Sequence, residues 1–517
     1  MRDLQKIGLD LPVAEAIPTL EKALQDKGLA VLVAPPGAGK TTLVPIRLLG
    51  AHWRGEGTII LLEPRRLAAR AAARRMASML GEEVGQTVGY RMRLDQKTSA
   101  KTRILVVTEG VFARMALDDP ELPGVTAVLF DEFHERSLDA DLGLALALDI
   151  RDGLRPDLRL MVMSATLDGA RVGQILGDAP VIEAKGRAFP VEIRHTDRKP
   201  DERLDESMAR AVMGALAAEA GSILAFLPGT GEINGTARRL EGCLPPHVRL
   251  YLLHGMMDSA AQDEAIRPAP AGIRKVVLAT SIAETSITID GVRVVIDSGY
   301  QRLPVFEPAT GLTRLETVRA SRASVDQRAG RAGRTAPGIA LRLWHAAQTA
   351  SLPAFTPPEI LAADLTGLLL DLAAFGVADP AQMRFLDPPP DPALNEAREL
   401  LKRLGALDDG GRLTDAGMQM RRLALPARLA HMLIEAAKAG SARHAAELSV
   451  LMTERGLGGN DADLDVRLAN FRRDRFDRTQ AAKGLAHRLA TEAGQMGADT
   501  QSMSSGALLI HAYPDRI

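Results

Sequence analysis

The sequence has little cysteine and no long uncharged apolar run. Its single cysteine, Cys243, excludes an internal disulfide and a cysteine-rich zinc site. Residues 1–20 lack the apolar core of a secretory signal, and no later run is long and uncharged enough to span a bilayer. These absences predict a cytoplasmic protein without a membrane partner.

Net charge is also small, because 64 Lys and Arg side chains face 65 Asp and Glu, giving a formal net charge of -1. A near-zero total can hide a local basic surface, which is what nucleic-acid binding requires. Residues 63–114 hold eleven Lys or Arg against five Asp or Glu. This segment predicts a groove for backbone phosphates or, alternatively, a solvated arginine-rich helix face.

A length of 517 residues exceeds what one hydrophobic core usually organises, so several domains are expected. Short β-rich runs alternate with helical patterns in two series, over residues 30–163 and 222–297. This alternation predicts two α/β lobes in tandem, each with a parallel sheet and its motifs at the carboxyl ends of the strands. The expected domains are 1–192, 193–372, 373–425 and 426–517.

A glycine-rich loop, APPGAGKTT, occupies residues 34–42 after an apolar strand run. Gly37 and Gly39 allow backbone N–H groups to turn towards phosphate, Lys40 supplies an ammonium, and Thr41 a hydroxyl for Mg²⁺. Ala34 stands where this loop pattern usually begins with glycine, so that turn must form without positive φ. The predicted nucleotide-binding residues of the loop are Gly37, Ala38, Gly39, Lys40, Thr41 and Thr42.

An acidic pair, Asp131 and Glu132, follows the apolar run 127–130. Asp131 is predicted to hold Mg²⁺ together with Thr41, and Glu132 to deprotonate the water that attacks the γ-phosphate. His134 is expected to link this site to the second lobe. Taken alone, such a pair is more often solvated surface, but the phosphate loop upstream favours the catalytic interpretation.

Two further motifs are expected at the nucleotide site. Ser164 and Thr166 follow another strand run and are predicted to relay the nucleotide state through hydrogen bonds, a cap by Thr166 being the alternative. In the second lobe QRAGRAGR, residues 327–334, predicts a helix that aligns Gln327, Arg328, Arg331 and Arg334 on one face at spacings of three and four. Neighbouring arginines repel unless an anion meets them, and phosphate fits their geometry. We therefore predict that Gln327, Arg331 and Arg334 complete one ATP site built from two lobes.

The motifs follow one another in a specific order: APPGAGKTT, EPRRLAAR, TEG, DEFHERSLDADLGLAL, SAT, FLPGTGEI, LHG, ATSIAETSITIDG and QRAGRAGR. In this the chain resembles the DEAH-box helicases of superfamily 2, and most of all the bacterial HrpB-type ATP-dependent helicases. The resemblance implies an α/β fold of two tandem RecA-like P-loop NTPase domains followed by a winged helix and a helical bundle. It implies ATP and Mg²⁺ as ligands, with other NTPs as alternatives.

The resemblance also assigns residues outside the phosphate loop. Those that it places along the nucleic-acid backbone are Arg65, Arg66, Thr108, Glu109, Gly255 and Thr280. It places Ser286 at the nucleotide and stacks Arg75 on one side of the base, but Ile266 stands where relatives have an aromatic residue on the other side. A loose nucleotide preference is therefore expected. Phe133 replaces the alanine of the family's DEAH box and should preserve its flanking side chains.

The C-terminal part reads as a winged helix followed by a helical bundle, which in the family closes the nucleic-acid channel. Residues 300–316 predict a β-hairpin that is either a strand-separating wedge or a simple edge hairpin. Near residue 475 four arginines alternate with Phe471 and Phe476, which predicts charge plus base stacking or a solvated helix with buried phenylalanines. The chain ends where relatives continue into a β-barrel, so either a truncated chain or a shortened homologue is expected.

The sequence as a whole predicts a monomeric NTP hydrolase that moves 3′ to 5′ along single-stranded RNA, or DNA, and separates duplexes with an overhang. The direction is implied by the family resemblance. Two other functions fit the same motifs: a remodeller that strips proteins from RNA without unwinding it, and a nucleotide-gated RNA clamp that hydrolyses too slowly to move. Protein partners are not predicted.

Overall fold

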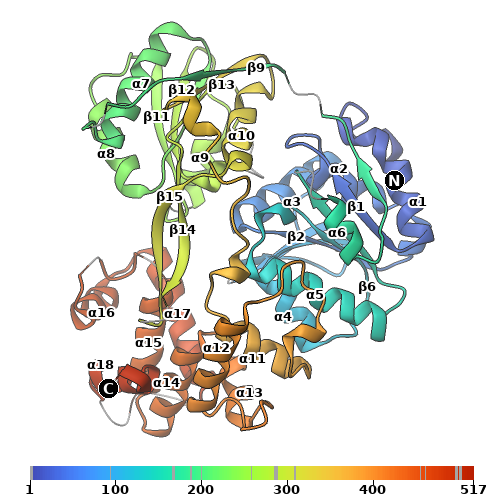
Figure 1. Ribbon diagram of the computed structural model, residues 1–517, viewed down its shortest axis with the longest axis vertical. Coiled ribbons are helices and arrows are strands. Elements are labelled where there is room, and N and C mark those ends of the chain that lie inside the picture. Colours follow the sequence, from blue (N-terminus) through green and yellow to red (C-terminus); the bar gives the residue numbers. More distant parts are fainter. Residues whose placement is uncertain are drawn as a thin grey trace. The chain divides into compact units, whose positions relative to one another are not determined.

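The computed structural model describes most of the chain, and its elements are labelled in Figure 1. The residues described are 4–516 without 94, 166–168, 187–188, 200, 258, 285–288, 308–309, 455, 460, 495–498 and 500–502. Two compact units are formed, one by Met1–Ala363 with Arg384–Asp387 and the other by Asp364–Met383 with Pro388–Ile517. Within the described residues, no helix combines the length and apolar character needed to cross a membrane.

Lobe 1, residues 4–186, is built on an eight-stranded sheet with the order β4-β3-β5-β2-β6-β7-β1-β8. Only β4 pairs antiparallel with its neighbour. The strands are β1 (Leu29–Val33), β2 (Thr58–Glu63), β3 (Val88–Met92), β4 (Asp95–Lys97), β5 (Ile104–Thr108), β6 (Val125–Phe130), β7 (Arg159–Ser164) and β8 (Val181–Glu183). The inner strands are apolar along their length, as in β1 (LAVLV), because both faces of a parallel sheet are covered.

The helices of lobe 1 alternate with its strands and pack on the sheet (Figure 1). They are α1 (Ile17–Asp26), α2 (Lys40–Leu48), α3 (Arg66–Leu80), α4 (Glu109–Asp118), α5 (Leu138–Gly153) and α6 (Gly169–Ile175). The phosphate loop, the acidic pair and the Ser164 motif follow β1, β6 and β7, three strands that are neighbours in the sheet. Their loops therefore meet at one sheet edge.

Lobe 2, residues 189–363, carries a six-stranded parallel sheet in the order β11-β12-β10-β13-β16-β9. Its strands are β9 (Val191–His195), β10 (Ser222–Phe226), β11 (Val248–Leu253), β12 (Arg274–Ala279), β13 (Val292–Asp297) and β16 (Gly338–Arg342). Its helices are α7 (Leu204–Ala218), α8 (Thr230–Leu240), α9 (Ser259–Ile266) and α10 (Arg322–Gly330). The prediction of two tandem α/β lobes with parallel sheets is confirmed.

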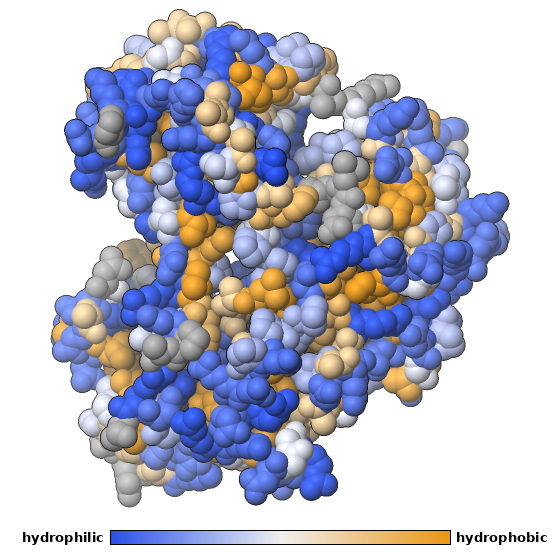
Figure 2. Space-filling model, viewed as in Figure 1, coloured by the Kyte–Doolittle hydropathy of each residue, from blue (hydrophilic) through white to orange (hydrophobic). Residues whose placement is uncertain are grey.

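A long antiparallel hairpin leaves lobe 2 after β13 (Figure 1). It consists of β14 (Tyr300–Glu307) and β15 (Leu312–Arg319), paired from Tyr300↔Arg319 to Glu307↔Leu312. Two apolar side chains of β15, Leu312 and Leu315, are exposed, and apolar residues are visible along the hairpin in Figure 2. The predicted hairpin is thus formed, and its role as a wedge stays a prediction.

The second unit is helical. It begins with α11 (Thr366–Phe375), α12 (Asp391–Arg403) and α13 (Asp415–Arg422), and a single antiparallel bridge joins Leu407 to Leu413 between the last two. Helix, short β contact and helix are the parts of a winged helix. The bundle that follows contains α14 (Ala427–Lys438), α15 (Ala442–Thr453), α16 (Leu464–Arg473), α17 (Asp477–Glu492) and α18 (Ser505–Ala512).

Candidate nucleotide and nucleic-acid site

The phosphate loop has the backbone that its sequence predicts. Gly37 and Gly39 adopt φ of 85° and 93°, which glycine alone adopts readily, and α2 begins at Lys40. Ala34 is not among the described residues with positive φ, and its N–H donates to the carbonyl of Ser164 at 3.0 Å. The loop thus directs backbone N–H groups of a helix N-terminus into the site, an arrangement that suits phosphate.

Lys40 and the acidic pair form a buried network. The Nζ of Lys40 lies 2.6 Å from Oε2 of Glu132 and 3.6 Å from Oδ1 of Asp131. The hydroxyl of Thr41 donates to Oδ2 of Asp131, and the backbone N–H of Glu132 donates to Oδ1 of Asp131 at 2.8 Å. The predicted Mg²⁺ residues, Thr41 and Asp131, are therefore adjacent.

The two carboxyls differ in acidity and in backbone. Burial raises the pKa of Asp131 to about 6, against the lowering effect of Lys40. Burial would also raise the pKa of Glu132, but Lys40 and His134 lower it to about 2, so this carboxylate is charged. Glu132 has a φ of 48°, a left-handed conformation that costs about 1–3 kcal/mol outside glycine. Such strain is typical of residues held for function.

His134 joins the two lobes. Its Nδ1 lies 3.5 Å from Oε2 of Glu132 and accepts the N–H of Ala165 at 3.3 Å. Its Nε2 lies 2.9 Å from Nε2 of Gln327 on α10 of lobe 2. Burial lowers the pKa of His134, which keeps the imidazole neutral near pH 7. One imidazole therefore connects the acidic pair, the strand end at β7 and the second lobe.

The arginines of QRAGRAGR do not all lie on one helix, because α10 ends at Gly330 and Arg331 begins a 3₁₀ turn. Arg328 points into lobe 2, where its Nε bonds Oε2 of Glu284 at 2.9 Å and its Nη1 bonds Oδ1 of Asp297 at 3.1 Å. Arg331 donates through Nε to the carbonyl of Glu284 at 2.8 Å. The anions that meet Arg328 are thus carboxylates of its own lobe.

The carboxylate of Glu132 acts on the pKa of both Arg331 and Arg334. Burial lowers the pKa of Arg331 well below its ordinary value, and Arg334 lowers it further while Glu132 raises it. Burial lowers the pKa of Arg334 to about 10, and Glu132 opposes this shift. Desolvated guanidiniums gain most from a strong anion, and phosphate is an anion of that kind.

Two further residues at this site were not predicted to belong to it. Glu63, at the end of β2, is fully buried, and neither of its carboxyl oxygens has a hydrogen-bond partner among the described residues. Burial, then Asp131 and Glu132, raise its pKa well above the usual range. Glu284 positions Arg328 and Arg331 at once. Glu63 lies in the motif EPRR and Glu284 in ATSIAETSITID, and these motifs are the sequence signal that could have identified both residues.

The residues predicted along nucleic acid form two groups. In lobe 1, Arg65 and Arg66 lie at the start of α3, and Thr108 ends β5, the neighbour of β2, with Glu109 directly after it. The guanidinium of Arg65 bonds the carbonyl of Ser281 at 2.8 Å and Oε2 of Glu135 at 3.0 Å, and Glu109 is buried. In lobe 2, Gly255 and Thr280 follow the paired strands β11 and β12. Each group lies at the carboxyl ends of neighbouring strands.

The residues predicted beside the nucleotide base come from both lobes. Arg75 is exposed on α3, and Ile266, the last residue of α9, packs against the core of lobe 2. It is the adjacent Arg74 that bridges the lobes, with Nη1 2.8 Å from Oδ2 of Asp263 on α9. Ser286 and Thr166 lie outside the described residues. Ala38 is buried in the loop, and the N–H of Thr42 donates to the carbonyl of Gly39 at 3.3 Å.

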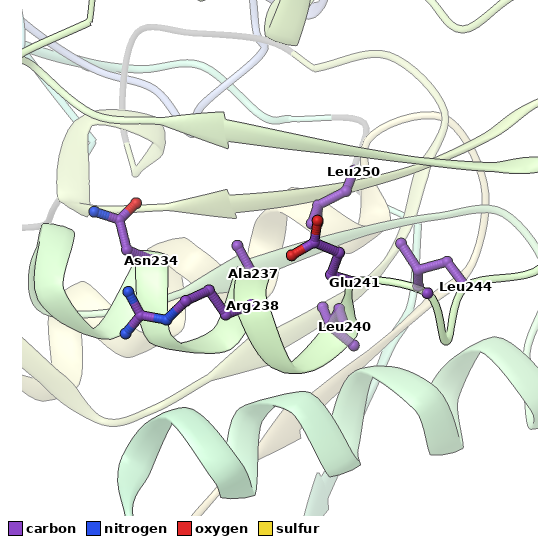
Figure 3. Close-up of a pocket in the computed structure, with 8 residues that line it drawn as sticks. Asn234, Ala237, Arg238, Leu240, Glu241, Leu244 and Leu250 are labelled. Atoms are coloured by element: carbon purple, nitrogen blue, oxygen red, sulfur yellow. The ribbon is translucent and has the colours of Figure 1, made fainter.

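A pocket elsewhere in lobe 2 has no part in this site. Its volume is about 590 Å³, and it opens between α8 and β11 (Figure 3). The residues that line it are Asn234, Ala237, Arg238, Leu240, Glu241, Gly242, Leu244 and Leu250. None of the predicted site residues is among them.

The donor set of the nucleotide site fits Mg²⁺ carried with a nucleotide. Among the described residues, no group of three or more His, Cys, Asp or Glu side chains forms a metal cage. Magnesium in nucleotide sites is usually held by one or two protein oxygens, with phosphate and water completing the octahedron. The hard oxygens of Thr41 and Asp131 meet that requirement.

Three family models match parts of the chain: DEAD/DEAH box helicase over residues 14–175, helicase conserved C-terminal domain over 206–336, and the winged-helix part of the helicase associated domain (HA2) over 397–425. The ATP-dependent RNA helicase HrpB of Escherichia coli (strain K12) is 48% identical over 507 residues, 98% of this chain. The chain is thus similar to the HrpB-type DEAH-box helicases over nearly its whole length. The two α/β lobes are accordingly RecA-like domains, as predicted.

Solved structures show the same similarity. A crystal structure of Escherichia coli DEAH/RHA helicase HrpB matches with a TM-score of 0.90 and 46% identity, over 98% of this chain and 63% of that one. A crystal structure of the E. coli DExH-box NTPase HrpB matches with a TM-score of 0.84 and 46% identity, over 98% of this chain and 61% of that one. The chain spans 61% of the length of its curated HrpB relative.

Proposed function

We propose that the protein is an NTP-driven motor that moves 3′ to 5′ along single-stranded RNA and separates duplexes. The observation that carries this proposal is the 2.9 Å contact between His134 and Gln327, which joins the acidic pair of one lobe to the second lobe. A nucleotide site completed by a second lobe couples hydrolysis to movement of the lobes. RNA is supported by the activity named for the curated HrpB relative. The direction rests on the family resemblance.

The hydrolytic step begins with an exchange of partners at Lys40. In the structure its ammonium lies 2.6 Å from Oε2 of Glu132 and keeps that carboxylate a weak base. When phosphate enters the loop, Lys40 turns to the phosphate and Glu132 loses its nearest cation. The pKa of Glu132 then rises, and the carboxylate can accept a proton from the attacking water.

The second lobe supplies the cationic half of the site. Arg331 and Arg334 are desolvated and near Glu132, so a γ-phosphate in front of that carboxylate would meet both guanidiniums. An arginine finger of this kind contributes about 10³–10⁵ in rate. Gln327, held against His134, orients the attacking water. Mg²⁺ held by Thr41 and Asp131 would neutralise charge on the outer phosphates.

Phosphate release and strand separation, measured on the same protein, test the proposal. Duplexes of RNA and of DNA carrying a 3′ or a 5′ overhang are incubated with ATP and Mg²⁺. We expect turnover that RNA stimulates and separation only of substrates with a 3′ overhang. Stimulated turnover without separation would indicate a remodeller, and negligible turnover with tight RNA binding would indicate a clamp. Either result would overturn the motor.

A further inference from the structure

The short turn between α16 and α17 displays an aromatic side chain among arginines. Two phenylalanines lie here in opposite surroundings, since Phe471 is 0% exposed and Phe476 is 79% exposed. One exposed apolar side chain is ordinary on a protein surface, so exposure alone assigns no role. The backbone around Phe476 and the charges beside it distinguish this residue.

Hydrogen bonds hold the turn in place on both sides of Phe476. The carboxylate of Asp474 accepts the N–H of Phe476 at 2.9 Å and the hydroxyl of Thr479 at 2.8 Å. The ammonium of Lys483 donates to the backbone carbonyl of Asp474 at 2.7 Å and lies 5.8 Å from the centre of the buried Phe471 ring. The exposed ring is therefore displayed by a fixed backbone, which reduces the entropy lost when a ligand binds it.

The arginines beside the ring differ in what they contact. Arg472 is paired with Glu447, with Nη2 2.6 Å from Oε2. Arg473 and Arg475 are exposed, and neither guanidinium forms an ion pair within the described part of the chain. The nearby carboxylate of Asp474 is already occupied by the turn. Two cations, one at the end of α16 and one within the turn, are thus available to an external anion.

We propose that Phe476 is a stacking platform for one base of a single-stranded nucleic acid, with Arg473 and Arg475 on the adjoining phosphates. A flexible polyanion with aromatic faces matches both features of the turn, whereas an apolar protein surface would cover the ring and leave two arginines unpaired. The site lies in the helical unit, and it includes none of the motif residues of the two lobes. This inference rests on the proposed binding of nucleic acid.

Binding of labelled single strands to the full chain tests the inference. The probes are a 20-nucleotide oligouridylate and a strand of the same length made of abasic spacers, measured by fluorescence anisotropy. Phe476→Ala should weaken oligouridylate binding about fivefold or more, because stacking is lost. It should leave binding of the abasic strand within about twofold, since that strand has no base to stack. Phe476→Trp should restore oligouridylate binding, and Phe476→Leu should not.

Controls separate stacking from charge and from folding. Phe355 is also exposed, at 60%, and Phe355→Ala should leave both affinities unchanged. Arg475→Gln should reduce the slope of log affinity against log salt by about 0.7 on both strands. An equal loss by Phe476→Ala on both strands, or no loss on oligouridylate, would overturn the platform while nucleic-acid binding stands. Failure of the wild type to bind either strand would overturn the proposed function as well.

Discussion

Replacing Glu109 by glutamine should stabilise the protein at neutral and alkaline pH. Glu109 is buried at the start of α4, where the hydroxyl of Ser137 donates to it. Burial raises its pKa from 4.5 to about 8; the Ser137 bond opposes this, and carboxylates including Glu135 and Asp139 add to it. Folding therefore retains a proton that the unfolded carboxyl releases.

The sign and size follow from this difference. Below pH 4.5 the Glu109 carboxyl does not lower the free energy of unfolding. Above pH 4.5 it lowers that free energy increasingly, until the pH passes about 8. At pH 7 the pH lies about 2.5 units above the ordinary pKa of Glu109, and each unit corresponds to about 1.36 kcal/mol. The buried carboxyl therefore lowers the free energy of unfolding at pH 7 by about 3 kcal/mol. Glutamine has no charge to desolvate, and its amide oxygen can still accept the Ser137 hydroxyl.

Thermal unfolding of lobe 1 at a series of pH values measures the effect. For a domain of this size about 3 kcal/mol corresponds to a rise in Tm of roughly 6–12 °C at pH 7. The rise should be larger at pH 8 and vanish near pH 4.5. Glu121→Gln, at an exposed position, is the matched control and should change little. A Glu109→Gln rise that does not depend on pH, or a fall at pH 8, would refute the reasoning.

Three further substitutions test the assignments at the nucleotide site. Glu132→Gln should keep ATP and RNA binding but lower turnover at least 10²-fold, since it cannot accept a proton; normal phosphate release by this variant would remove Glu132 as the base. Arg328→Met should lower the Tm of lobe 2, because removing one partner of a buried ion pair costs about 3–5 kcal/mol. An unchanged Tm would show that the contacts of Arg328 to carboxylates do not stabilise the lobe. Ile266→Phe should lower KM for ATP about fivefold by adding a stacking surface for the base. The wild type should use the four common NTPs with similar KM. A wild type already selective for ATP would contradict the predicted loose nucleotide preference.

Much of the site could be predicted because parallel strands deliver their loops to one edge. The phosphate loop after β1 and the acidic pair after β6 needed only an apolar run followed by polar residues. Glycine at positions 37 and 39 predicted the positive φ that the loop adopts. Local sequence decides these features, so they were readable without the fold.

Other features depend on long-range packing and escaped prediction. Spacing alone placed Arg328 and Arg331 on one helix and gave both a phosphate, but α10 ends at Gly330 and Arg328 bonds Glu284, 44 residues earlier in the chain. The left-handed backbone of Glu132 is imposed by its surroundings, since glutamate has no preference for it. The isolation of the Glu63 carboxyl is likewise a property of the assembled core.

The central claim is that lobe 2 completes a catalytic site whose turnover is coupled to RNA. Phosphate release as a function of single-stranded RNA concentration, for the wild type and Arg331→Ala, tests it most directly. We predict saturable stimulation of the wild type and a loss of about 10³ or more in the variant, with RNA affinity retained. Negligible wild-type turnover that RNA does not change, or a variant that hydrolyses ATP as fast as the wild type, would contradict the account.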